Sequence, residues 1–454
     1  MCRPAKSIKI ESCIEILKES FSKFKDPRNT KQITISLPDF LMSSYAVFAL
    51  KYPSLLSFQT DFYSGTIAKS CTGLFGIKSL PSDTHLRDVM DVVDHRQFRS
   101  IFKKLFAFTQ RNKLLENFEF LKVRTTPYYL LAGDGTGYFS SHKINCSGCS
   151  IYNEEDEDKV TRFGHQVFAA SIVHPDRKEV LPMCPEPIYK EDGLDKNDCE
   201  LNAFKRFIKD FKREHPKLNV IFLGDALYAN GVAMDLLESN KMHFILNIKL
   251  KQQVLLSAYN KLKSRGMTAE VVVTEKSGSK IVKTTQKVHR YINGYRYAQQ
   301  SQKRVNFIEL VETVSWFDKA GDEHIERKKF TWITNINITD ENVEKLAKGA
   351  RSRWKIENET FNTLKNHGYN LEHNYGHGKK DLSKNLITMM FIAFYIDQIQ
   401  QASCQRFKRM VERLGKRSYV WRKLKELIDL VPIEGWDVAY GILSRDVKIS
   451  INTC

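Results

Sequence analysis

The sequence predicts an α/β protein in which a mixed β-sheet is covered on both faces by helices. Three observations lead to this fold class. Two short apolar segments, 128–134 and 220–225, each end in Gly-Asp and have the composition of buried strands. Amphipathic helical patterns over 201–211 and near 231–240 separate the apolar segments along the chain. A stretch of shorter, alternating patterns between 269 and 334 predicts further strands.

Residues 1–120 are predicted to form a helical N-terminal domain. Apolar residues recur there at helical spacing, and Ser82 or Asp83 can cap the start of one such helix, which carries Leu86, Val89, Met90 and Val93. Several Lys and Arg residues follow between 96 and 113. A DNA-binding or dimerisation domain and a plain helical packing domain both agree with this pattern.

The rest of the chain divides into four parts. Residues 121–250 are expected to form the first part of the core, with strands at 128–134, 166–173, 179–188, 220–225 and 243–248. Residues 251–335 are predicted to be a β-rich insertion, and residues 336–402 the second part of the core. The apolar run 386–396 is too short to span a bilayer and predicts a buried helix. Residues 403–454 form a basic C-terminal region.

An acidic residue stands on an apolar helical stripe in the second part of the core. Ala350, Glu357, Phe361 and Leu364 are spaced to face inward together, so Glu357 is expected at a buried position. A buried carboxylate is costly unless it is paired or binds a metal. Glu359 is a weaker candidate, because it lies off this stripe.

The two Gly-Asp strand ends supply possible partners for Glu357. In a parallel sheet, functional groups gather at the carboxyl ends of strands, so Asp134 and Asp225 are expected side by side if their strands are neighbours. Repulsion between two carboxylates favours a bound cation. Mg²⁺ suits such oxygen ligands, and two ions can serve phosphodiester chemistry. The three acids therefore predict a metal-dependent nuclease site.

Charge and cysteine content restrict the kind of partner and compartment. The formal net charge is +18, from 71 Lys and Arg against 53 Asp and Glu, which favours a polyanionic partner over a merely basic surface. The first 20 residues lack the apolar core of a signal peptide, and the nine cysteines are scattered. A cytoplasmic protein with reduced thiols and no membrane segment is expected.

The chain resembles the DDE-type transposases of bacterial insertion sequences, in the cut-and-paste group with a Tyr-Arg-Glu-Lys signature. The resemblance covers about residues 80–400 and rests on three stretches, Leu131-Ala132-Gly133-Asp134-Gly135-Thr136, Phe222-Leu223-Gly224-Asp225-Ala226-Leu227-Tyr228, and Arg353-Trp354-Lys355-Ile356-Glu357 through Leu364-Lys365. The signature is incomplete: Ala350 stands where its Tyr is expected and Leu364 where its Lys is expected, with Lys365 one residue further on.

This resemblance implies an RNase H-like fold with a β-strand insertion between the second Asp and the Glu. It implies that Asp134, Asp225 and Glu357 hold two divalent ions, Mg²⁺ with Mn²⁺ as a substitute. The implied activity is cleavage at transposon ends followed by transfer of the 3′-hydroxyl strand to target DNA. The implied partners are double-stranded DNA and a second copy of the chain, which together synapse two ends in a nucleoid-associated complex.

Several residues are candidates for contacts with DNA. Arg353 and Lys365 are expected near the cleaved end, and Tyr228 is either a DNA contact or a packing residue. Trp354 is expected to anchor the catalytic helix in the core. The basic C-terminal stretch is expected to contact DNA phosphates, although a charged helix that only faces solvent agrees with the same pattern. The residues of this stretch that are candidates for phosphate contacts are Lys408, Arg409, Lys416 and Arg417.

A Cys-x-x-Cys pair, Cys146 and Cys149, follows the first predicted catalytic strand. It could hold zinc with further ligands among Cys184, Cys199, His142 and His165, but unbound reduced cysteines are the favoured interpretation. His373 and His377 are spaced as a helical metal pair, and the glycines on either side of His377 argue against a helix there.

Two other functions remain as hypotheses. One is an RNase H-like metal-dependent DNA nuclease without strand transfer. The other is a non-catalytic DNA-binding protein derived from a transposase, against which the three intact acids argue.

Overall fold

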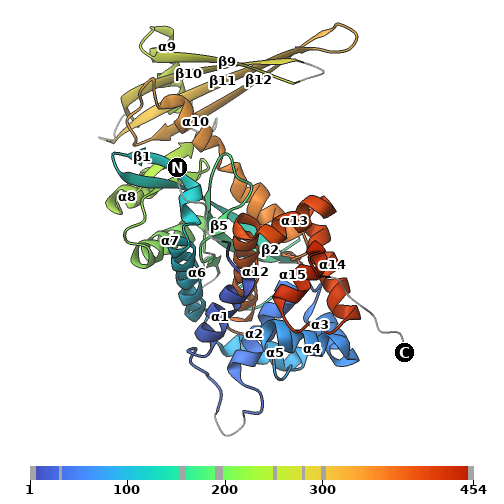
Figure 1. Cartoon of the computed structure of the whole chain (residues 1–454). Helices are drawn as coiled ribbons and strands as arrows, with labels where there is room; N and C mark the ends of the chain where they lie inside the picture. The colour runs from blue at the N-terminus through green and yellow to red at the C-terminus, as the bar shows by residue number, and fades with distance from the viewer. Residues whose placement is uncertain are drawn as a thin grey trace.

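The computed structural model consists of a helical body and a β-arm that projects from it (Figure 1). It describes residues 7–29, 33–152, 160–189, 198–248, 253–278, 282–297 and 303–447. The β-arm is made of one helix and four strands, α9 (Gln253–Ser264), β9 (Ala269–Ser277), β10 (Lys283–Arg296), β11 (Arg304–Phe317) and β12 (Glu323–Thr334). The alternating pattern of residues 251–335 thus predicted this insertion correctly.

One mixed sheet runs from the body into the β-arm, in the order β3-β4-β2-β7-β8-β12-β11-β10-β9. Strand β2 pairs antiparallel with β4 and parallel with β7, and β7 pairs parallel with β8. The arm joins this core where β12 pairs with β8. The strands of the body are β1 (Glu119–Val123), β2 (Thr126–Ser141), β3 (Ser150–Tyr152), β4 (Arg162–Val173), β5 (Leu181–Pro182), β6 (Glu186–Ile188), β7 (Val220–Gly224) and β8 (His243–Asn247). The predicted mixed α/β fold is confirmed.

Two strand predictions differ from the structure. The strand expected over 179–188 is split into β5 and β6, because Pro182 and Pro185 have no N–H for a continuous ladder. The strand expected to end at Asp134 continues to Ser141, since β4 pairs with β2 as far as Ser141. Asp134 therefore lies inside a strand, whereas Asp225 directly follows β7.

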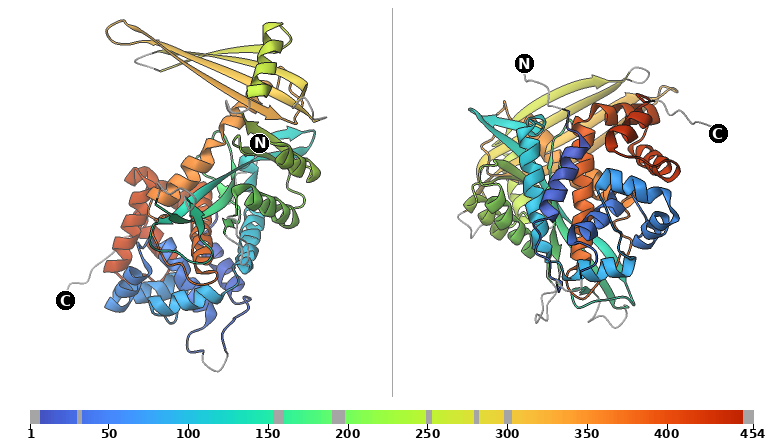
Figure 2. Two further views of the ribbon diagram at one scale, coloured as in Figure 1. Left: turned by 180° about the vertical axis from the view of Figure 1, so that it is seen from behind. Right: turned by 60° about the horizontal axis from the view of Figure 1, so that its bottom comes forward.

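The helices of the body surround a long central helix, α12 (Leu382–Ser403), which is buried along its whole length. Helices α1, α2, α5 and α6 of the N-terminal region pack against it (Figure 2, right). This arrangement confirms the buried helix predicted from the apolar run. Among the residues that the structure describes, no helix is both long and apolar enough to cross a membrane.

The N-terminal region is helical, as predicted, and it contacts the C-terminal helices as well as α12. Its helices are α1 (Ile10–Phe21), α2 (Leu37–Ala49), α3 (Leu55–Ser64), α4 (Thr66–Phe75), α5 (Asp83–Val92), η2 (His95–Phe98), α6 (Arg99–Arg111) and η3 (Leu115–Phe118). Of the two residues predicted to cap α5, Ser82 is the one that does so, because its hydroxyl accepts a hydrogen bond from the N–H of His85.

The C-terminal helices are α13 (Gln405–Leu414), α14 (Arg417–Leu430) and α15 (Trp436–Ser444). Helix α14 packs against α4, so the two ends of the chain share one helical body. The remaining helices flank the sheet: α7 (Glu200–Glu214), α8 (Gly231–Ser239), α10 (Val343–Arg351), the π-helix η5 (Ile356–Phe361) and α11 (Asn362–Asn366).

Candidate active site

The pairing of β2 with β7 brings the two aspartates to the same level of the sheet. The parallel register runs from Tyr129 opposite Val220 to Ala132 opposite Leu223. If this register continues for two more residues along both strands, Asp134 lies opposite Asp225. Neighbouring strands lie about 4.8 Å apart, so the two carboxylates start from adjacent backbone positions. The expectation that these two strands are neighbours is confirmed.

The repeated Gly-Asp pattern has a packing cause. A β-carbon on Gly133 or Gly224 would lie 2.7 or 2.8 Å from the Phe222 ring, which is too close for any other residue type. Successive residues of a strand point to opposite faces of the sheet. The glycines thus face the aromatic core, and the aspartates that follow them face the other way, where η5 contacts β2 and β4.

Arg353 connects Asp134 to Glu357. Its guanidinium donates to Oδ2 of Asp134 at 3.1 Å and to Oε1 of Glu357 at 2.7 Å. The Arg353 side chain is only 16% exposed, so this ion pair lies partly shielded from water. The structure thus brings three of the predicted site residues into one chain of contacts, with Asp225 beside Asp134.

Glu357 is not buried, contrary to the prediction from the apolar stripe. Its side chain is 50% exposed, whereas Ala350, Phe361 and Leu364 are buried. The stripe assumed a regular α-helix, but α10 ends at Arg351 and η5 is a π-helix with wider turns. The rotation of 100° per residue that a regular α-helix has therefore does not hold across this segment. As a result, the Glu357 side chain points outward to Arg353.

The irregular helix also changes the places of Trp354 and Glu359. Trp354 is exposed and does not anchor the core; Lys355 is buried instead and donates to the carbonyl of Arg177 at 2.6 Å. Glu359 lies 3.6 Å from Arg417, on the side of the C-terminal helices. This placement favours Glu357 over Glu359 as the partner of the two aspartates.

A fourth carboxylate, Glu200 at the start of α7, lies beside the aspartates and was missed in the sequence. Its Oε2 would lie 2.3 Å from a β-carbon on Gly135, the residue after Asp134. The hydroxyl of Tyr228 donates to Oε1 of Glu200 at 2.5 Å. An acid in the first turn of a helix is common for reasons of the helix dipole alone, so its sequence position carries no sign of this role.

Tyr228 is a packing residue in this structure. Its side chain is fully buried and its ring lies against Phe168, Phe204 and Phe222. Of the two interpretations open for Tyr228 in the sequence, the geometry agrees with packing, with the hydroxyl positioning Glu200.

The electrostatics of the site suit a divalent cation. Burial raises the pKa of Asp134 to about 7; Glu200 and Asp225 add to this rise, and Arg353 opposes it. Burial also raises the pKa of Glu200, with a further contribution from Asp225. Crowded carboxylate oxygens of this kind are ligands that Mg²⁺ prefers, and a bound cation relieves their repulsion.

The three acids do not converge as tightly as a preformed metal cluster. Within the described ranges, the groups whose ligand atoms all lie within 4.8 Å are Cys146, Cys149, His165 and His377, and separately Asp94, His95 and Asp381. Arg353 holds Asp134 and Glu357 through its two nitrogens, which sets the separation of these carboxylates.

Three of the other candidates for DNA contact, Lys408, Lys416 and Arg417, line a groove between the C-terminal helices and the segment after β4. The groove has a volume of about 470 Å³, and its basic lining consists of Lys178, Lys408, Lys416 and Arg417. Arg417 donates to Oε1 of Gln401 at 2.5 Å. Outside the groove, Arg409 is paired with Asp446 at 3.0 Å and Lys365 with Glu372 at 2.7 Å.

Comparison with known proteins adds a family to this geometry. Residues 193–395 match the family described as Transposase DDE domain. The match runs from α7 to α12 and includes Asp225 and Glu357, while Asp134 lies before its start. No curated protein matches the chain. The segment from α7 to α12 is thus similar to the DDE domain of transposases, and it lies within the mixed sheet and helices described above.

Proposed function

We propose that the chain cleaves DNA at transposon ends and transfers the released 3′-hydroxyl strand to target DNA. The observation that carries this proposal is the level placement of Asp134 and Asp225, with Arg353 linking Asp134 to Glu357. Two of these acids lie in the segment that matches the transposase domain. The family acts on DNA, and the net charge of +18 agrees with a polyanionic partner.

In this proposal Asp134, Asp225 and Glu357 hold divalent metal, Mg²⁺ with Mn²⁺ as a substitute, in two ions. When bound, these ions supply Lewis-acid activation of the attacking oxygen and charge stabilisation of the leaving one. Glu200 adds negative charge next to Asp134 and is itself fixed by Tyr228. Arg353 balances the charge of two carboxylates and is proposed to contact a DNA phosphate near the cleaved end.

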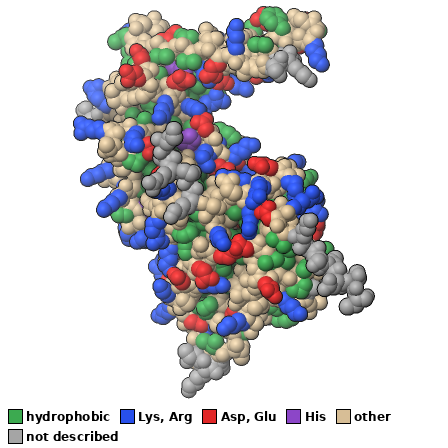
Figure 3. All heavy atoms as spheres, viewed as in Figure 1, with side chains coloured by type: hydrophobic (Ala, Val, Ile, Leu, Met, Phe, Trp, Pro, Cys, Tyr) green, Lys and Arg blue, Asp and Glu red, His purple; other side chains and the backbone are tan. Residues whose placement is uncertain are grey.

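DNA is proposed to run from the acids towards the basic groove. Lys178, Lys408, Lys416 and Arg417 line that groove, and Lys and Arg neutralise phosphates with little sequence preference. Arg417 contacts Glu359 of η5, so the groove adjoins the helical segment that carries Glu357. The β-arm overhangs the body and leaves an open notch beneath it (Figure 3). A homodimer that synapses two ends completes the proposal.

The test is a joining assay with pre-cleaved end oligonucleotides, a target plasmid and either Mg²⁺ or Mn²⁺. Joined products support the proposal. Hydrolysis without joining would favour the nuclease, and DNA binding with neither reaction would favour the non-catalytic protein. Asp225→Asn is expected to abolish cleavage and joining while it leaves DNA binding intact. The control is Asp235→Asn, a carboxylate exposed on α8 and paired with Lys303.

A further inference from the structure

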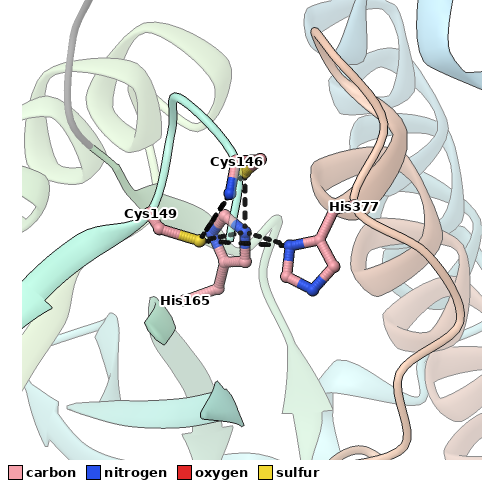
Figure 4. Close-up of side chains that lie close together, drawn as sticks. All are labelled: Cys146, Cys149, His165 and His377. Carbon is pink, nitrogen blue, oxygen red and sulfur yellow. Dashed lines mark hydrogen bonds between the residues drawn. The ribbon is translucent and has the colours of Figure 1, made fainter. Parts of the chain in front are cut away.

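Four side chains from three separate segments meet at one point away from the acids. Cys146 and Cys149 come from the loop between β2 and β3, His165 from β4, and His377 from the loop between α11 and α12. Figure 4 shows both sulfurs and both imidazoles turned towards a common centre. His377 is more than 200 residues from the other three in sequence, so only the fold brings this set together.

The spacings of these atoms are those of a tetrahedral zinc site. Zinc–sulfur bonds of about 2.3 Å and zinc–nitrogen bonds of about 2.05 Å give edges of about 3.8 Å between sulfurs, about 3.6 Å between sulfur and nitrogen, and about 3.3 Å between nitrogens. The two sulfurs are 3.7 Å apart, and Nε2 of His165 lies 3.3 and 3.4 Å from them. Nδ1 of His377 lies 3.1 Å from Nε2 of His165 and 4.0 Å from Sγ of Cys149.

Hydrogen bonding alone does not account for this arrangement. Nε2 of His165 has three heteroatoms within 3.4 Å, the two sulfurs and Nδ1 of His377, and it carries at most one hydrogen. A disulfide is also excluded as it stands, because its sulfurs would be about 2.05 Å apart. Four lone pairs that converge on one centre match a cation with soft and imidazole ligands.

The backbone of the cysteine pair forms a tight turn with one amide directed at a sulfur. The N–H of Cys149 donates to the carbonyl of Cys146 at 3.1 Å, and the N–H of Cys146 lies 3.4 Å from Sγ of Cys149. Amide N–H groups directed at a sulfur stabilise its thiolate form, which is the form that binds metal. Cys149 and His165 are buried and Cys146 and His377 are partly buried, so the cluster is only partly open to bulk water.

We propose that Cys146, Cys149, His165 and His377 bind one structural Zn²⁺ ion. Four protein ligands close the tetrahedral sphere and leave no open position for substrate, as in structural zinc sites. The ion joins the β2–β3 loop and β4 to the loop that leads from the Glu357 segment into α12. It therefore fixes the strand that carries Asp134 relative to the chain that follows Glu357.

The surroundings hold His377 in place for this role. The Phe139 ring packs on the His377 ring with centroids 4.0 Å apart, and the Tyr138 ring stacks on His165 at 5.7 Å. Gly376 and Gly378 adopt φ values of +133° and +67°, which bend the loop so that His377 reaches the cysteines.

The other ligand candidates of the sequence lie elsewhere. His373 packs against Tyr375, and Nδ1 of His142 faces the carbonyl of Thr161 at 2.9 Å. Cys184 is buried and Cys199 is exposed, and neither belongs to the group of four. The glycines around His377 do exclude a helical His373–His377 pair, but they permit a site whose partners come from other segments.

The test is the metal content of the full chain, measured by plasma mass spectrometry after exchange into metal-free buffer. We expect one zinc per chain in the wild type and loss of most of it in Cys146→Ser and in His377→Asn. Cys199→Ser and His373→Asn are matched controls, one exposed thiol and one histidine of the same loop, and both are expected to keep the zinc. Asp225→Asn is expected to keep it too.

X-ray absorption of the zinc-loaded wild type gives a result that does not depend on how the variants fold. Two sulfur and two nitrogen ligands at about 2.3 and 2.0–2.1 Å are expected. A wild type that takes up no zinc, a sphere of oxygen ligands only, or a folded Cys146→Ser variant that keeps a full equivalent would each overturn the proposal. Loss of zinc in Asp225→Asn but not in His377→Asn would overturn it as well, by placing the ion at the acids.

Discussion

Arg353 is the residue on which the arrangement of the candidate site depends. It contacts both Asp134 and Glu357, and these two acids lie 223 residues apart in the chain. Its positive charge opposes the burial and the neighbouring carboxylates that raise the pKa of Asp134. A divalent cation must therefore compete with Arg353 for the same carboxylates.

Removal of this competitor is expected to strengthen metal binding while it weakens catalysis. In Arg353→Gln, we expect tighter Mn²⁺ binding by titration calorimetry and less strand joining than in the wild type. Arg351→Gln is the control, because Arg351 pairs with Glu312 of the β-arm at 2.6 Å instead. Weaker Mn²⁺ binding in Arg353→Gln would show that the guanidinium orients the acids for metal and does not compete with it.

Single residues were predictable where their role follows from local pattern. Asp134 and Asp225 follow glycines at the ends of apolar runs, and the structure sets them side by side. The orientation of Glu357 and Trp354 was wrong, since a π-helix cannot be recognised from a 3.6-residue period. Glu200 and His377 depend on long-range contacts, which a single sequence does not reveal.

His215 is expected to make the protein sensitive to mild acid. Burial lowers its pKa to about 4, with Lys103 and Arg99 adding to the effect, and its ring packs against Phe106. His215 of the unfolded chain takes up a proton near pH 6.5, whereas His215 of the folded chain does so only near pH 4. The stability that neutral His215 contributes is therefore fully present above pH 6.5 and is lost as the pH falls from there towards pH 4. His215→Phe should therefore lose less stability than the wild type between pH 7 and pH 5, by about 1–2 kcal/mol.

Urea unfolding of both proteins at the two pH values measures this difference. An equal loss in wild type and variant would contradict the assignment to His215.

Helix α12 holds the body together, and a buried ion pair is built into it. Asp397 accepts bonds from Lys51 at 2.6 Å and from Tyr369, and both charged side chains are less than a tenth exposed. Burial raises the pKa of Asp397 and lowers that of Lys51, while their mutual attraction opposes both shifts. The pair thus links the N-terminal helices to the segment after the Glu357 helix.

Loss of one member of this pair should be severe. Lys51→Met leaves a buried carboxylate with no cation, at an expected cost of about 3–5 kcal/mol in the free energy of unfolding. Adding Asp397→Asn removes the buried charge and should restore much of that loss. Urea denaturation of the single and double variants measures both effects, and a double variant no more stable than Lys51→Met would contradict this account.

Elements were predicted well where one pattern runs through the whole element. The apolar run of α12 and the alternating strands of the β-arm appear as expected. The extension of β2 past Asp134 was missed because it depends on pairing with β4. The separation of β5 from β6 likewise depends on how each strand pairs with β4, and on the prolines within residues 179–188.

The whole molecule combines a helical body, a mixed sheet and an overhanging β-arm with an excess of positive charge. What the sequence did not show is that the N-terminal and C-terminal helices pack around the same helix, α12, and against each other. The basic groove forms beside this shared body.

The basic groove makes a prediction about salt dependence. Each phosphate contact contributes about −0.9 to the slope of log K against log salt for duplex DNA, so Lys408→Gln with Lys416→Gln should reduce that slope by about 2. Arg409→Gln is the control, because Arg409 lies outside the groove and is paired with Asp446. Fluorescence anisotropy across a salt series measures the slopes, and equal changes in the two variants would place the DNA elsewhere.

The central claim is that Glu357, and not Glu359, acts with Asp134 and Asp225 in metal-dependent strand transfer. Both glutamates lie on η5, but only Glu357 contacts the arginine shared with Asp134. The most direct measurement is joining of pre-cleaved ends in Mg²⁺ by Glu357→Gln and Glu359→Gln, at concentrations where both bind DNA equally. We expect Glu357→Gln to lower the joining rate by about a hundredfold or more, a loss of about 2.7 kcal/mol in transition-state stabilisation, and Glu359→Gln to stay within a few fold of wild type. Full activity in Glu357→Gln, or the larger loss in Glu359→Gln, would contradict the proposed site.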